Sequence, residues 1–170
     1  MNNFKKAALA SLVFAAVGTA QAADPSAVLT WTGTVPGVAA GDTLIITGSG
    51  GSETIENGTI TAQQDGTFTS SSIALEAHTN DGSVDAPVVG ALQSATWSVS
   101  NPTITYGGAF DATLNKNLVV FADGVKVTDT ANILGAQAET VSLSVASETP
   151  VEGVDGDEVQ ATLTVIASAV

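Results

Sequence analysis

The chain offers few residues able to carry acid–base, nucleophilic or metal chemistry. Its single histidine, His78, stands in a polar stretch, and there is no cysteine. One histidine without cysteine does not make a familiar zinc site. No serine lies in the Gly-x-Ser-x-Gly setting of a nucleophile elbow, so a hydrolytic triad built on His78 lacks its nucleophile. We therefore expect His78 to be an ordinary residue near the end of a strand.

Aspartate and glutamate side chains, which could bind metal ions or act as acids and bases, are more numerous but form no recognisable motif. The densest acidic cluster is Glu152, Asp155, Asp157 and Glu158, and its spacing does not match the 12-residue calcium loop of helix–loop–helix proteins. Paired carboxylates also hydrolyse glycosides, but two tryptophans and one tyrosine provide few platforms for a sugar. The glycine-rich stretch at residues 48–51 lacks the lysine of a phosphate-binding loop. These residues predict no enzyme, metal site or cofactor, and we expect the acidic cluster to be a solvated loop.

The first residues have the pattern of an export signal. Lys5 and Lys6 precede an apolar run over residues 7–17, and Ala20-Gln21-Ala22 has the small-x-small form of a cleavage site. The run is too short to span a bilayer. We therefore interpret residues 1–22 as a secretory signal peptide.

The net charge of the chain disfavours some classes of binding partner. Without the signal, two lysines remain against 17 acidic residues, a formal charge of −15. Nucleic acids and anionic membrane surfaces both require basic side chains, so both are disfavoured as partners. A basic partner or cations suit such a chain better.

The rest of the chain is typical of an all-β protein. Short stretches rich in valine, isoleucine and threonine are separated by turn signals about every ten residues, which is the spacing of a β-sandwich. Asp123-Gly124 predicts a tight hairpin, and Asn101-Pro102 predicts a turn after a strand at residues 95–100. Residues 38–42 are expected to be a linker or turn, and residues 79–87 a polar loop.

Two stretches at the C-terminal end alternate cleanly between apolar and polar residues. They cover residues 139–147 and 158–168. The apolar positions of the second stretch are Val159, Ala161, Leu163, Val165 and Ala167. Such a period of two predicts strands with one face buried.

A third alternating stretch lies directly after the signal, at residues 27–35. One face carries Ala27, Leu29, Trp31, Gly33 and Val35. The other face carries mostly threonine, which favours extended backbone and tolerates water. Pro36-Gly37 then ends the strand, because proline has no N–H to continue a ladder.

This stretch resembles the N-terminal extension of chaperone–usher pilins. Those extensions alternate apolar residues, with an aromatic residue, a glycine and a valine at successive inward positions, as Trp31, Gly33 and Val35 stand here. The Trp-x-Gly-x-Val-Pro form, the lack of cysteine and the C-terminal strands look most like major fimbrial subunits of the cysteine-free enterobacterial coli-surface-antigen type.

The resemblance implies an incomplete immunoglobulin-like sandwich at residues 38–170, preceded by a donor strand at residues 23–37. The sandwich lacks its last strand, and the extension of a neighbouring copy fills the gap by strand addition. The C-terminal strand at Val159–Ala167 is then one wall of the acceptor groove and a contact for a periplasmic chaperone. The further implied partners are an outer-membrane usher and a tip adhesin, and the implied location is a fimbria on the cell surface.

A second interpretation is a monomeric exported β-sandwich that binds carbohydrate or calcium through loops such as residues 148–157. In that protein the strand at residues 27–35 belongs to its own sandwich.

Overall fold

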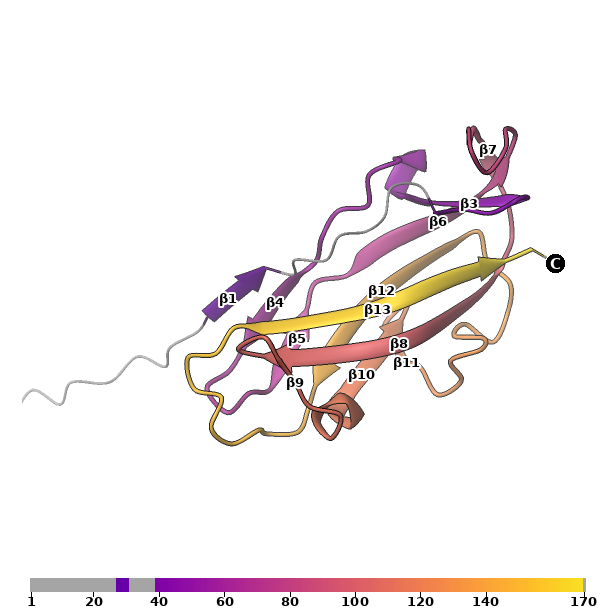
Figure 1. The fold of residues 1–170 in the computed structure, drawn as a ribbon. Coiled ribbons are helices and arrows are strands. Elements are labelled where there is room, and N and C mark those ends of the chain that lie inside the picture. The colour runs from indigo at the N-terminus through magenta and orange to yellow at the C-terminus, as the bar shows by residue number, and fades with distance from the viewer. Residues whose placement is uncertain (1–26, 31–38, 170) are drawn as a thin grey trace, which may run out of the picture.

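The structure, a computed structural model, describes residues 27–30 and 39–169, with side chains from residue 40 (Figure 1). The signal peptide prediction, Trp31, Gly33 and Val35 lie outside the described residues. The strands are β1 (Ala27–Thr30), β2 (Ala39–Ala40), β3 (Leu44–Gly48), β4 (Thr59–Ala62), β5 (Phe68–Ser70), β6 (Ile73–Asn80), β7 (Val89–Leu92), β8 (Thr96–Tyr106), β9 (Ala109–Phe110), β10 (Leu118–Ala122), β11 (Val125–Lys126), β12 (Thr140–Ser147) and β13 (Val159–Ser168). The helices described are two short 3-10 turns, η1 (Ser49–Gly51) and η2 (Leu114–Asn117). The prediction of an all-β protein is confirmed.

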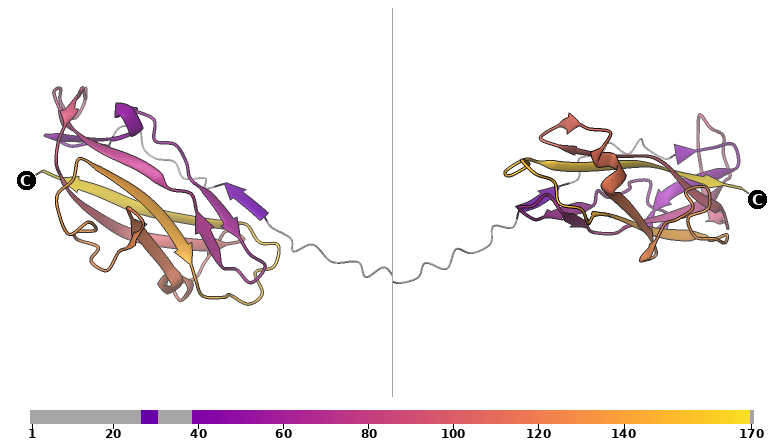
Figure 2. Two further views of the ribbon diagram at one scale, coloured as in Figure 1. Left: turned by 180° about the vertical axis from the view of Figure 1, so that it is seen from behind. Right: turned by 90° about the horizontal axis from the view of Figure 1, so that it is seen from below.

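The strands form two antiparallel sheets. In the larger sheet, β12 pairs with β10 on one side and with β5 and β6 on the other. The strand β6 continues the sheet to β3 and then β2, and β5 continues it to β4 and then β1. The smaller sheet has the order β13-β8-β9. Figures 1 and 2 show β8 and β13 lying across one face of the larger sheet.

One apolar core joins the two sheets. The larger sheet contributes Ile60, Leu75 and Leu143, and the smaller sheet contributes Trp97 and Ile104. Two polar atoms of the smaller sheet also find partners outside it. The indole of Trp97 donates to the Ala138 carbonyl at 2.9 Å, and the Tyr106 hydroxyl donates to the Gly66 carbonyl at 2.7 Å. Burial raises the pKa of Tyr106 because the charged phenolate is disfavoured away from water.

The predicted turn at Asn101-Pro102 is wrong, because both residues lie inside the single strand β8. The register with β13 shifts there, so that two residues of β8 stand opposite Leu163. This is a β-bulge, in which Asn101 takes a positive φ of 48°. The extra residue changes the parity of the strand, so odd-numbered Val99 and even-numbered Ile104 both face the core.

Other local predictions had mixed outcomes. The hairpin at Asp123-Gly124 is confirmed, since both residues have positive φ and join β10 to β11. The predicted linker at residues 38–42 is wrong in part, because Ala39–Ala40 forms β2 and pairs with β3. The polar loop predicted at residues 79–87 is instead the tip of a hairpin, since β7 returns to pair with the end of β6.

Candidate functional site

The strand predicted as an acceptor wall, β13, is paired along one edge only within the described residues. Its ladder runs along β8 from Val159 opposite Tyr106 to Ser168 opposite Thr96. The far edge of a strand in this position presents backbone N–H and C=O groups to any added strand. The C-terminal strand is therefore long, and none of the other described strands pairs with its outer edge.

The inward apolar row of β13 is covered unevenly. Val159 and Ala161, at its start, are each 3% exposed. Leu163, Val165 and Ala167 are only partly buried, although all three pack against the core. The five residues predicted as an acceptor wall thus share one face of one strand. From Leu163 onward, the core beneath that face is incompletely covered.

The N-terminal segment β1 forms an edge strand against β4. Its backbone register places Leu29 opposite Ile60 and Ala27 opposite Ala62, in antiparallel order. It also approaches β13, and Figure 1 shows it near the start of that strand. Of the five predicted donor positions, the structure describes the backbone of Ala27 and Leu29 in this strand.

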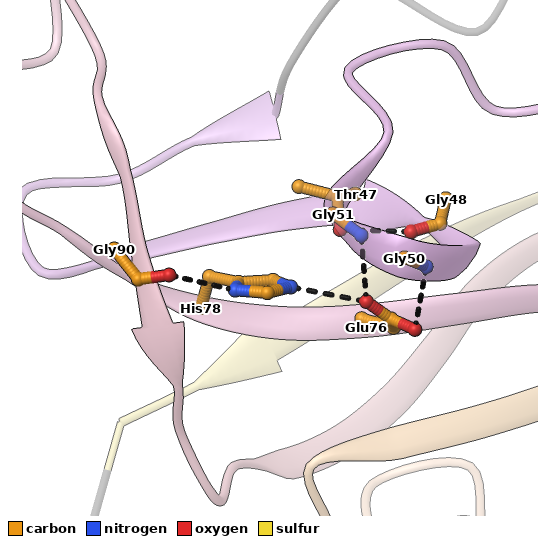
Figure 3. Close-up of polar contacts among 7 residues, drawn as sticks. All are labelled: Thr47, Gly48, Gly50, Gly51, Glu76, His78 and Gly90. Atoms are coloured by element: carbon orange, nitrogen blue, oxygen red, sulfur yellow. Dashed lines mark hydrogen bonds and ion pairs between the residues drawn. The ribbon is translucent and has the colours of Figure 1, made fainter.

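His78 is more tightly held than an ordinary strand-end residue. It is 7% exposed near the end of β6 and lies between Glu76 and the carbonyl of Gly90 (Figure 3). The Nδ1···Gly90 O distance is 3.0 Å and the Nε2···Glu76 Oε2 distance is 3.1 Å. The two contacts together engage both ring nitrogens and fix the orientation of the ring.

Glu76 ties this histidine to the loop at η1. Its two carboxylate oxygens accept from the backbone N–H groups of Gly50 and Gly51, each at 2.8 Å. The pKa of Glu76 lies below its usual value, mainly because of the hydrogen bond from Gly50 and next because of the hydrogen bond with His78. These contacts fasten η1, β6 and β7 to one another (Figure 3). We interpret the cluster as structural.

The acidic loop shows no ion site in the described part of the chain. No group of three or more histidine, aspartate or glutamate side chains gathers there as metal ligands. Of the helices described, neither is long and apolar enough to cross a membrane.

A hollow lies on the face of the larger sheet that points away from the core. Its volume is about 540 Å³, and it lies over β4, β5, β10 and β12. Its lining includes Thr61, Thr69, Phe121 and Ser144. Phe121 was not singled out from the sequence, because an apolar run such as residues 118–121 does not tell which side chains face outward.

Comparison of the chain with protein-family models, with curated proteins and with solved structures finds no significant match.

Proposed function

We propose that this protein is a structural subunit of a surface fimbria, which polymerises when the N-terminal extension of one copy lies along β13 of the next. The observation that carries the proposal is that no described strand pairs with the outer edge of β13, next to an apolar row that is only partly buried from Leu163 onward. An added strand supplies backbone hydrogen bonds along that edge and side chains for the uncovered row.

The order of the strands supports the proposal. A constant-type immunoglobulin sandwich has strands A, B, E and D in one sheet and C, F and G in the other. Here β3, β6, β12 and β10 follow one another in the larger sheet, and β8 pairs with β13 in the smaller one. With β8 and β13 as C and F, the described residues hold no strand in the place of G. A neighbour's extension fits that place.

The extension itself suits the role. Burial of Leu29, Trp31 and Val35 is worth roughly 1.5–3 kcal/mol each, before the cost of ordering the strand. In the single chain, β1 pairs with β4, and in a fibre we expect the same segment to leave β4 for the neighbour. Because donor and acceptor surfaces differ, the contact does not close on itself and generates a fibre.

The test compares two faces of the extension. We expect Trp31→Asp and Gly33→Leu to abolish fibres on cells and the detergent-resistant ladder of oligomers, while the exported subunit is still made. Thr32→Asp adds the same charge on the opposite face and serves as the matched control. Normal fibres from Trp31→Asp, or no fibres from the unaltered chain, would refute the proposal.

A further inference from the structure

Three exposed apolar side chains lie along the β6–β7 hairpin, residues 78–92. Val84 is 50% exposed, Val88 54% and Leu92 45%. Single exposed apolar residues are ordinary, but several together on one projecting element favour a contact surface. Figures 1 and 2 show β7 at the end of the sandwich near the C-terminus.

The hairpin has a defined shape, because hydrogen bonds hold it from base to tip. Asp81 N–H donates to the Val88 carbonyl at 2.9 Å, and Ser83 N–H donates to the Ala86 carbonyl at 3.1 Å. The side-chain oxygen of Asn80 accepts from the N–H of Gly82 at 3.0 Å and of Val88 at 3.3 Å. The exposed valines are therefore presented on a fixed surface.

Asn80 also fastens the hairpin to the beginning of the sandwich. Its amide nitrogen donates to the Gly41 carbonyl at 2.9 Å, and its backbone N–H donates to the Thr43 carbonyl at 2.9 Å. Gly41 stands two residues after Ala39, where β2 begins. The four steps from Val35 to Ala39 span at most about 14 Å. A contact that fixes Val35 therefore also keeps the β6–β7 hairpin of the same subunit near that contact.

The opposite end of the sandwich carries an exposed aromatic residue. The strand β13 begins there, with Val159 opposite Tyr106, and Tyr106 also pairs with Ala109 in β9. The next residue, Phe110, is 60% exposed. Figures 1 and 2 show β9 and β7 at opposite ends of the molecule.

We infer that in the fibre the β6–β7 hairpin of each subunit packs on Phe110 of the neighbour that accepts its extension. The inference rests on the proposed function and adds a second contact between the same two copies. Antiparallel pairing is the more stable mode and the one that all described pairs use. An extension running antiparallel to β13 ends with Val35 beside Val159, which brings its own hairpin to the Phe110 end of the neighbour.

The charges of the two surfaces predict how this contact depends on salt concentration. Asp81 and Asp85 lie on the hairpin, and Asp157 and Glu158 lie near the start of β13. These carboxylates repel one another across the contact, so salt should strengthen the packing of hairpin on Phe110. Burial of the donor strand is mainly apolar and should respond much less.

The lack of cysteine allows a test by cross-linking. Fibres are assembled from the mature chain carrying Val88→Cys and Phe110→Cys and treated with a short bis-maleimide, then boiled in detergent to separate subunits that are not covalently linked. We expect a ladder of linked subunits, several-fold stronger than from the matched pair Val88→Cys and Val125→Cys. Val125 is 70% exposed and lies on β11, away from the inferred contact. We also expect the 88–110 ladder to increase with salt.

The outcomes separate this inference from the proposed function. Fibres that assemble but link residues 88 and 110 no better than residues 88 and 125 overturn the hairpin contact alone. A mixture of the two single-cysteine chains should give linked pairs and no longer ladder, since each contact joins two different ends. If the unaltered chain forms no fibres, the proposed function fails, and this contact fails with it.

Discussion

The proposed acceptor edge of β13 can be tested by replacing one methyl group in its partly buried apolar row. Val165→Thr keeps the shape of the side chain and replaces a methyl by a hydroxyl. Val165 stands opposite Val99 and is only partly buried in the single chain, so the hydroxyl still reaches water there. We therefore expect the free energy of unfolding of the single chain to fall by less than about 1 kcal/mol.

In the fibre the expected cost is larger, because an added strand covers the same side chain. A hydroxyl buried without a partner costs about 1–3 kcal/mol, and each 1.4 kcal/mol is a factor of about ten in an equilibrium constant. Each contact between subunits should therefore weaken about ten-fold or more. Urea unfolding measures the single chain, and the loss of oligomers in detergent on heating measures the contact.

The matched control is the next residue, Ile166, whose side chain lies on the other face of β13. Ile166 is 45% exposed, and Ile166→Thr should alter neither measurement by more than a few tenths of a kcal/mol. Equal loss of oligomers from the two variants would contradict the assignment of β13 as the acceptor edge. An equal loss in urea unfolding and in fibre stability for Val165→Thr would contradict it as well.

Three further expectations concern the sandwich and its extension. Asn101→Val should lower the free energy of unfolding by about 1–2 kcal/mol, because a β-branched residue is strained at positive φ, whereas Asn101→Gly should be nearly neutral in the same urea titration. Glu76 has a lowered pKa in the folded chain, so its contribution to stability is present above the usual glutamate value of 4.5 and is lost as the pH falls through the folded value. Glu76→Gln should lower the free energy of unfolding at pH 7 by about 1–3 kcal/mol and make that free energy depend less on pH on the acid side. An unchanged pH dependence would contradict the contacts with η1. In a Trp97→Phe background, Trp31 is the remaining tryptophan, and we expect its fluorescence to shift to shorter wavelength on polymerisation, because the proposed contact buries its indole.

Much of the strand content could be predicted from the sequence because its causes are local. The alternation at residues 139–147 and 158–168 corresponds closely to β12 and β13, since a period of two follows from the pleat itself. The turn at Asp123-Gly124 was equally predictable, because these two residue types tolerate positive φ and favour a tight hairpin. The donor strand at residues 27–35 stays a prediction, based on the same kind of pattern.

Features that depend on distant partners were missed or misinterpreted. Asn101-Pro102 has the composition of a turn, but pairing with β13 keeps both residues in one strand and makes them a bulge. Asn80 looked like one polar residue of a loop, and only the approach of Gly41 and Val88 gives its amide three backbone partners. In both cases the decisive contact comes from a segment at least eight residues away.

The sequence by itself determined that this chain forms many short strands, two of them with a clear apolar face, and that it carries no familiar catalytic constellation. Tertiary structure alone decided that β13 pairs with β8, that none of the other described strands pairs with its second edge, and that Leu163 and Val165 are less covered than Val159. The physical reason is that alternation along a strand records which face is buried, whereas the neighbour at each edge depends on the order of strands far apart in the chain.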